Sequence, residues 1–174
     1  MQSEKSFENF PIWMPCVACA LSLSIYITGA YILLRSGILF CVLYLLYCLW
    51  LEFSVLKESC ANCCYYGKTC GLGRGKFCAM LFTPGDPQAF VEKEISWKHL
   101  LPDFFVFIFP LAGGIIYLIK HFTWLILALL AALAILSLGG NALMRGALAC
   151  KYCRQRELGC PAEQLFNKRQ AGTT

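Results

Sequence analysis

Residues 37–56 read GILFCVLYLLYCLWLEFSVL, and Glu52 is their only charged residue. At a rise of about 1.5 Å per residue, a helix of this length crosses the roughly 30 Å hydrocarbon core of a bilayer. Three further stretches are similarly long and apolar, namely residues 11–34, 101–119 and 122–144. Backbone polar groups in lipid must be hydrogen-bonded within their own segment, so each stretch predicts a membrane-spanning helix. The sequence therefore predicts an all-α integral membrane protein with four such helices.

The overall composition points the same way. Of the 174 residues, 59% are hydrophobic and 14% are charged. An average soluble domain is about half apolar and about a quarter charged. This balance excludes an ordinary soluble domain and a disordered chain. The first stretch is too long for a signal-peptide core, and it follows a segment with Glu4 and Glu8 beside Lys5, so we expect it to be retained.

The segments between the spans differ greatly in length. Only residues 35–37 separate the first two spans, and only residues 120–121 separate the last two, which predicts two tight helical hairpins. The chain then divides into an N-terminal tail with hairpin 1, a Cys-rich loop, hairpin 2 and a Cys-bearing tail that packs on the loop. In residue numbers these units are 1–56, 57–100, 101–144 and 145–174. Asp86-Pro87 is a typical helix start, so we expect a short interfacial helix inside the loop.

The basic residues lie almost entirely on one side of this topology. Four spans place the N-terminus, the Cys-rich loop and the C-terminal tail on the same side. Thirteen of the fifteen Lys and Arg residues lie there, and only Arg35 and Lys120 lie on the other. The positive-inside rule predicts that the loop and both termini are cytoplasmic. The basic residues are scattered rather than aligned, so the sequence favours a lipid bilayer over nucleic acid as the partner.

Eight of the twelve cysteines lie in the loop and the tail, and each segment contains a C-x-x-C pair. A C-x-x-C turn directs two sulfurs toward one centre, and a tetrahedral Zn²⁺ site needs four ligands at about 2.3 Å. The two pairs predict a first metal site made of Cys60, Cys63, Cys150 and Cys153. The remaining thiols predict a second site, with the division between the two sites left open: Cys64, Cys70, Cys78 and Cys160.

Other metals and bonds remain as alternatives for these thiols. Cys160-Pro161 is similar to the C-P ending of ferredoxin runs, and this favours an iron–sulfur electron-transfer subunit as the second interpretation. The ferredoxin spacing C-x₂-C-x₂-C is absent, so zinc is preferred. A disulfide framework ranks lower because the cytosol keeps thiols reduced.

Four further cysteines lie within the spans. Cys41 and Cys48 are expected to pack as small apolar side chains. Cys16 and Cys19 are three residues apart and share a helix face, which would suit a soft-metal transporter or a thiol-redox protein. The pair is similar to the paired cysteines in the first span of small mercury-uptake proteins. Quinone-coupled disulfide oxidoreductases are also four-helix proteins with C-x-x-C pairs, but their redox cysteines work on the extracytoplasmic side.

The sequence contains no set of residues typical of an enzyme. There is no Ser-His-Asp arrangement, H-E-x-x-H motif or pair of acidic residues suited to catalysis. The first hypothesis is therefore a non-enzymatic scaffold or membrane-complex subunit. Its zinc-bearing module would dock a cytosolic or membrane protein partner.

Overall fold

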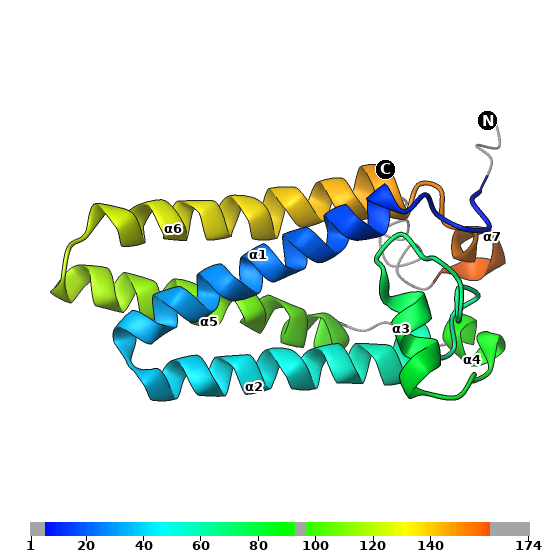
Figure 1. Cartoon of the computed structure of the whole chain (residues 1–174), viewed down its shortest axis with the longest axis horizontal. Coiled ribbons are helices and arrows are strands. Elements are labelled where there is room, and N and C mark those ends of the chain that lie inside the picture. Colours follow the sequence, from blue (N-terminus) through cyan, green and yellow to red (C-terminus); the bar gives the residue numbers. More distant parts are fainter. Residues whose placement is uncertain (1–5, 93–96, 161–174) are drawn as a thin grey trace, which may run out of the picture.

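The structure is a computed structural model that describes residues 6–92 and 97–160. Within these ranges the chain is helical, with one isolated backbone bridge between Phe7 and Cys153 and no strand. Four long helices run side by side (Figure 1). Their bounds are α1 Trp13–Ser36, α2 Ile38–Val55, α5 Trp97–Lys120 and α6 Trp124–Ala134.

Four helical segments are long and apolar enough to cross a membrane: Trp13–Ser36, Ile38–Cys60, Leu101–Lys120 and Trp124–Ala149. This confirms the prediction of four apolar helices. The second and fourth segments end later than residues 56 and 144, where the sequence predicted their ends, because wider helical turns follow α2 and α6. These turns are η1 Leu56–Cys60, η2 Ile135–Gly140 and η3 Leu143–Ala149. As a result, each C-x-x-C pair begins where a long helix ends.

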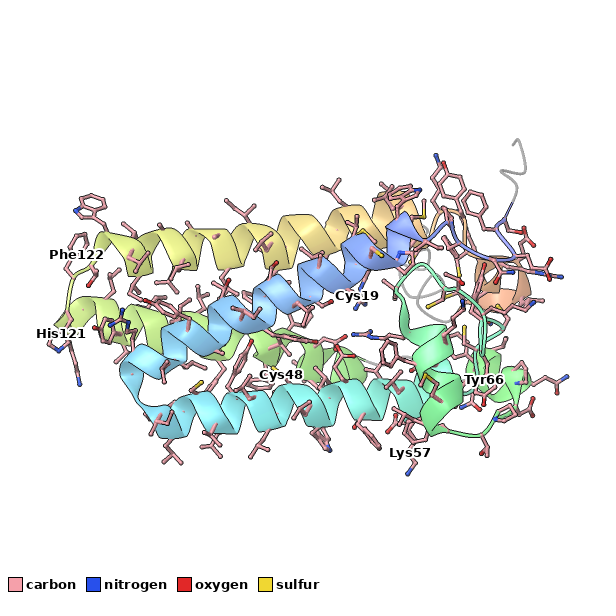
Figure 2. The ribbon with its side chains drawn as sticks, in the orientation of Figure 1. Cys19, Cys48, Lys57, Tyr66, His121 and Phe122 are labelled. Atoms are coloured by element: carbon pink, nitrogen blue, oxygen red, sulfur yellow. The ribbon has the colours of Figure 1, made fainter. Side chains whose placement is uncertain are left out.

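Both predicted hairpins are present. Gly37 alone joins α1 to α2, and its φ of 150° is a conformation that favours glycine. Residues 121–123 join α5 to α6. Figure 2 shows His121 and Phe122 at the end of the bundle opposite Lys57 and Tyr66.

The interior of the bundle is small and tightly packed. Its most deeply buried side chains include Ile32, Leu33, Tyr44 and Leu133. The helices α1 and α5 each contact the other three long helices, so this pair joins the bundle together. Many large apolar side chains on the outer faces of the four helices are exposed. In lipid, no hydrophobic driving force buries such side chains. Apolar outer faces are therefore expected for helices that cross a membrane.

The helix α5 continues through Pro110, although proline has no backbone N–H to donate. The carbonyl of Val106, one helical turn earlier, therefore loses its usual partner. The buried Tyr44 hydroxyl of α2 donates a hydrogen bond of 3.0 Å to this carbonyl. A neighbouring helix thus satisfies the backbone group that proline leaves free, which a membrane environment requires.

Three short helices gather with the beginning of α1 at one end of the bundle (Figure 1). They are α3 Arg74–Leu81, α4 Pro87–Glu92 and α7 Gln155–Gly159. The expected helix start is present at α4, where the Asp86 carboxylate accepts a hydrogen bond of 2.9 Å from the Gln88 backbone N–H. Residues 93–96, through which the expected interfacial helix would continue, lie outside the described residues. This end of the bundle positions the cysteine-rich site.

Candidate functional site

The two C-x-x-C pairs form the same local turn. The backbone N–H of Cys63 donates to the Cys60 carbonyl at 3.3 Å, and the N–H of Cys153 donates to the Cys150 carbonyl at 3.3 Å. The first pair begins at Cys60, the last residue of η1, and the second begins at Cys150, directly after η3. The sequence expectation that both pairs reach the same end of the molecule agrees with this placement. Each turn holds two sulfur-bearing residues close to a helix end.

The N-terminal segment and Tyr65 join the loop to the tail. The N–H of Phe7 donates to the Tyr152 carbonyl at 3.0 Å. The buried Tyr65 hydroxyl donates to the Phe7 carbonyl at 2.5 Å, and it accepts a bond of 2.9 Å from the Arg154 backbone N–H. Phe10, Met14 and Tyr65 form a small buried cluster against the cysteines of both segments. Three segments that are far apart in sequence are therefore docked around these thiols.

Gln155 connects the tail to the vicinal pair Cys63 and Cys64. Its side chain is only 2% exposed. Its carbonyl oxygen Oε1 accepts bonds from the Cys64 backbone N–H at 3.1 Å and from the Cys63 Sγ at 3.8 Å. Its amide nitrogen Nε2 is buried without a hydrogen-bond partner among the described residues. An unsatisfied buried donor costs about 1–3 kcal/mol. A thiolate sulfur is an acceptor that could remove this cost.

The sulfur of Cys70 accepts a hydrogen bond from the backbone. The backbone N–H of Gly75 lies 3.2 Å from the Cys70 Sγ. The turn that allows this contact includes Gly73, whose φ is 78°. Cys78, with a fully buried side chain, instead donates from its thiol to the Leu56 carbonyl at 3.3 Å.

The eight predicted ligands differ in exposure. Cys78 is buried and Cys150 is exposed, whereas the others are partly buried: Cys60, Cys63, Cys64, Cys70, Cys153 and Cys160. None of the twelve cysteines, all within the described ranges, forms a disulfide. In residues 6–92 and 97–160, no three or more His, Cys, Asp or Glu side chains form a ready-made metal-binding group. Metal binding would therefore require these side chains to draw together.

The thiols have different proton affinities. Burial raises the pKa of Cys153 to about 12. A hydrogen bond between the neighbouring thiols raises the pKa of Cys63 and lowers that of Cys64, and Arg154 and Lys68 lower the Cys64 pKa further. Cys64 is thus the thiol of this pair that ionises first. A metal that binds the others must displace their protons, so binding would depend on pH.

A polar contact that sequence analysis missed holds α3 against the bundle. Arg74 of α3 forms an ion pair of 2.6 Å with Glu52 of α2, and the Tyr26 hydroxyl of α1 donates to the same carboxylate oxygen at 2.5 Å. Cys19 lies beside this contact, because a Cβ added to Gly73 would come within 2.9 Å of its Sγ. Figure 2 shows Cys19 on α1 and Cys48 on α2.

The two cysteines of α2 lie away from the cysteine-rich end. Cys41 and Cys48 are buried in α2, and Cys48 belongs to the main apolar core. Their burial is consistent with the packing role expected for small apolar side chains. Cys16 and Cys19 are both exposed.

Sequence analysis also missed most of the residues that dock the loop and the tail. Phe7 and Phe10 are aromatic residues in an otherwise polar N-terminal segment. Tyr65 directly follows Cys64, and Tyr152 lies inside the second C-x-x-C pair. Aromatic side chains outside the spans, next to cysteines, were the available signal. Gln155 carried no comparable signal, because its role depends on a contact with a distant segment.

A cavity of about 280 Å³ lies at the same end, between α4 and α7, lined by Pro87, Gln88, Val91, Gln155 and Leu158.

No protein-family model matches the sequence, and no curated protein or solved structure matches it. The geometry of the cysteine-rich end is therefore the basis for any functional conclusion.

Proposed function

We propose that this chain is an integral membrane scaffold or complex subunit whose cysteine-rich end binds Zn²⁺ through cysteine thiolates. The loop and both termini face the cytoplasm in this proposal. The observation that carries it is Gln155, whose amide oxygen contacts Cys63 and Cys64 and whose buried amide nitrogen has no hydrogen-bond partner within residues 6–92 and 97–160. A thiolate bound to a metal would accept from this donor, and such outer hydrogen bonds orient and tune metal ligands.

The chemistry of the surrounding residues also supports zinc. Eight thiols from two segments are held at one end, which is enough for two Cys₄ sites. A Cys₄ site with Zn²⁺ carries a net charge of about −2, and nearby cations reduce its cost. Lys68 and Arg154 interact electrostatically with Cys64, and Arg74 interacts with Cys60.

Metal binding would explain how this end can hold its shape. In the described part of the chain, the apolar clusters at this end contain six buried residues, in contrast to the larger core of the bundle. Zinc–thiolate bonds supply folding free energy to segments that lack a sizeable apolar core. The zinc would join the loop after α2 to the tail after η3, and so restrain two long helices.

The docking part of the proposal is supported by α3. Phe77, Met80 and Leu81 of this helix are 64%, 80% and 55% exposed, and they lie outside the four apolar spans. An exposed apolar patch rimmed by polar residues is typical of a surface that contacts another protein or a membrane, and we assign it to a protein partner here. Phe77→Ser with Met80→Ser should abolish co-purification of the partner while zinc content is unchanged. Loss of zinc in this double variant would show that the patch stabilises the site instead.

Elemental analysis with an absorption spectrum tests the metal directly. The protein is purified in detergent without air and without a metal-affinity tag. About two Zn per chain and no visible absorption band are expected. Iron with acid-labile sulfide would overturn the zinc proposal in favour of an electron-transfer subunit. A protein with neither metal would exclude both.

Gln155 provides a sharper test of the site. We expect Gln155→Leu to weaken zinc retention against a chelator by about 10–100-fold, the usual effect of losing an outer hydrogen bond. Gln88→Leu is the matched control, because Gln88 lines the same cavity and is exposed. Equal zinc retention by wild type and Gln155→Leu would remove the main support for the proposal.

Orientation can be tested independently of metal. An epitope tag placed after Thr174 should be accessible to antibody only after the membrane is permeabilised. Accessibility in intact cells would place the cysteine-rich end outside and overturn the cytoplasmic assignment.

A further inference from the structure

Residues 7–10 cross the cysteine-rich end as a non-helical segment that is fastened to both the tail and the loop. The segment precedes α1 and lies beside the short elements at this end (Figure 1). The backbone N–H of Phe7 donates to the Tyr152 carbonyl at 3.0 Å, in the tail. The N–H of Phe10 donates to the Thr69 carbonyl at 2.9 Å, in the loop. We call residues 7–10 the strap, because it ties these two distant segments together.

The aromatic side chains of the strap belong to an apolar cluster that also contains thiols. Phe10 is only 3% exposed, and its ring centroid lies 5.5 Å from those of Phe7 and Tyr65. The Phe7 ring lies in turn 5.2 Å from the Tyr152 ring. Thiols from both the loop and the tail pack against this cluster, namely Cys63, Cys64, Cys70 and Cys153.

Two other loop thiols belong to a separate cluster. Cys78 is buried there beside Leu56 and Ala61. The partly buried Cys60 and Phe82 pack against these residues. The strap contributes no residue to this second cluster as far as the chain is described. Six of the eight thiols are therefore divided by the side chains that cover them.

We propose that the strap is a closed lid over the thiols of the first cluster, and that its opening admits soluble molecules to them. These thiols are Cys63, Cys64, Cys70 and Cys153. Cys60 and Cys78 stay covered by their own cluster when the strap opens. This inference goes beyond the proposed function, because it rests on packing and applies whether or not the thiols bind zinc.

The remaining contacts of the strap allow it to open while the bundle stays folded. Glu8 pairs with Lys68 at 3.1 Å, but the two side chains are 68% and 41% exposed. An exposed pair of this kind contributes about 0–1 kcal/mol. The strap belongs to no helix, so its release breaks no helical turn. Segments held in this way open locally at a smaller free-energy cost than unfolding of the whole protein.

Alkylation of each cysteine measures this access directly. Protein in detergent is reduced, dialysed against a chelator without air and treated with N-ethylmaleimide, and each labelled residue is quantified by mass spectrometry. In Phe7→Ala with Phe10→Ala, the four thiols of the first cluster should react at least about tenfold faster than in the wild type, because two packed rings are lost. Cys60 and Cys78 should keep their wild-type rates.

Phe82→Ala is the reciprocal control, because this ring packs on the second cluster. It should accelerate the alkylation of Cys60 and Cys78 and leave the thiols beside the strap unchanged. Monodisperse elution and wild-type helix content are required of each variant.

A milder variant covers the case in which the double substitution prevents folding. The Asn9 side-chain oxygen accepts a bond of 3.3 Å from the Thr69 N–H. Asn9→Ala should accelerate the same four thiols by about two- to tenfold, which corresponds to one net hydrogen bond. Asn62→Ala is its matched control, because it removes a bond of 3.2 Å to the Glu58 carbonyl, away from the strap. The thiols beside the strap should keep their wild-type rates in this control.

The outcomes separate this inference from the proposed function. Equal acceleration of all six thiols in the strap variants would show general loosening and overturn the lid. Unchanged rates in these variants would overturn it as well. Absence of zinc from the wild type would overturn the proposed function and leave this inference in place.

Discussion

Arg74 Nη2 lies 2.6 Å from Glu52 Oε1, so the first residue of α3 is ion-paired with α2. The side chains are 23% and 28% exposed, which leaves little water around the pair. The Tyr26 hydroxyl donates to the same carboxylate oxygen. A single carboxylate therefore connects α1, α2 and the cysteine-rich loop. Removing one partner of such a pair leaves an uncompensated charge, and this destabilises the folded protein.

Removing one charge of this pair should destabilise the protein. We expect Glu52→Gln or Arg74→Gln to lower the free energy of unfolding by about 1–3 kcal/mol, because the remaining charge loses its partner. The double variant should be less damaging than the sum of the two single variants. Unfolding by denaturant in detergent micelles measures each value.

The exposed pair between Lys68 and Glu8, at 3.1 Å, is the matched control. Lys68→Gln should change stability by less than about 1 kcal/mol, as is usual for surface pairs. Strictly additive losses in the Glu52 and Arg74 variants would show that these two residues do not act as a pair.

Gly75 should not tolerate any side chain. A Cβ at this position would lie 2.4 Å from the Tyr65 carbonyl oxygen and 2.5 Å from that of Lys68, both of which are backbone atoms. We expect Gly75→Ala to cost about 1–3 kcal/mol or more of stability, as in other overpacked sites. It should also weaken the N–H contact to the Cys70 sulfur. Thermal unfolding and zinc content would report the two effects.

Gly139 is a suitable control because nothing lies within 4 Å of an added Cβ. Gly139→Ala should leave stability unchanged or raise it by up to about 1 kcal/mol, since alanine favours helices over glycine. If Gly75→Ala were as stable as Gly139→Ala, the described path of the backbone near Cys70 would be wrong.

The helices could be predicted from sequence because their signals are local. An apolar run such as residues 37–56, with one charged residue near its end, sets both the length and the environment of a helix. The hairpin at Gly37 follows for the same reason, since few residues remain between two such runs. The ion pair of Glu52 could not be predicted. Its partner Arg74 reaches it only because the loop folds back against the bundle, which is a non-local contact.

The candidate site shows the same limit. The turns of the two C-x-x-C pairs are local, and spacing alone indicated them. The proximity of Cys64 to the tail depends instead on Gln155 and Tyr65. These contacts join residues about ninety positions apart, and no spacing rule contains them. The sequence could therefore indicate candidate thiol ligands, but not which of them face one another.

The hydroxyl of Tyr44 should contribute to the stability of the protein, although its surroundings are apolar. Its hydroxyl is the hydrogen-bond partner of the Val106 carbonyl that Pro110 leaves free. Tyr44→Phe should lower the free energy of unfolding by about 1–3 kcal/mol, the cost of an unsatisfied buried polar group. Tyr31→Phe, which removes an exposed hydrogen bond from Arg35, is the control. Adding Pro110→Ala should restore much of the lost stability, and failure of this rescue would contradict the explanation.

Tyr65 should make the docking of the loop on the tail sensitive to alkaline pH. Burial raises its pKa to about 12, whereas an unfolded tyrosine ionises near 10. Between these values the folded protein retains a proton that the unfolded chain has lost, so stability falls as pH rises. The contribution of Tyr65 is complete below about pH 10 and is lost as pH passes through about 12. The ionised hydroxyl can no longer donate to the Phe7 carbonyl.

We therefore expect Tyr65→Phe to act in two ways. At neutral pH it should lower stability by about 1–2 kcal/mol, because the Arg154 N–H and the Phe7 carbonyl each lose a partner. Between pH 10 and 12 its stability should fall less steeply than that of the wild type. Tyr66→Phe, which removes the bond to the Phe82 carbonyl, should keep the wild-type slope. Chemical unfolding across this pH range measures all three proteins, and equal slopes for wild type and Tyr65→Phe would show that another group controls the alkaline transition.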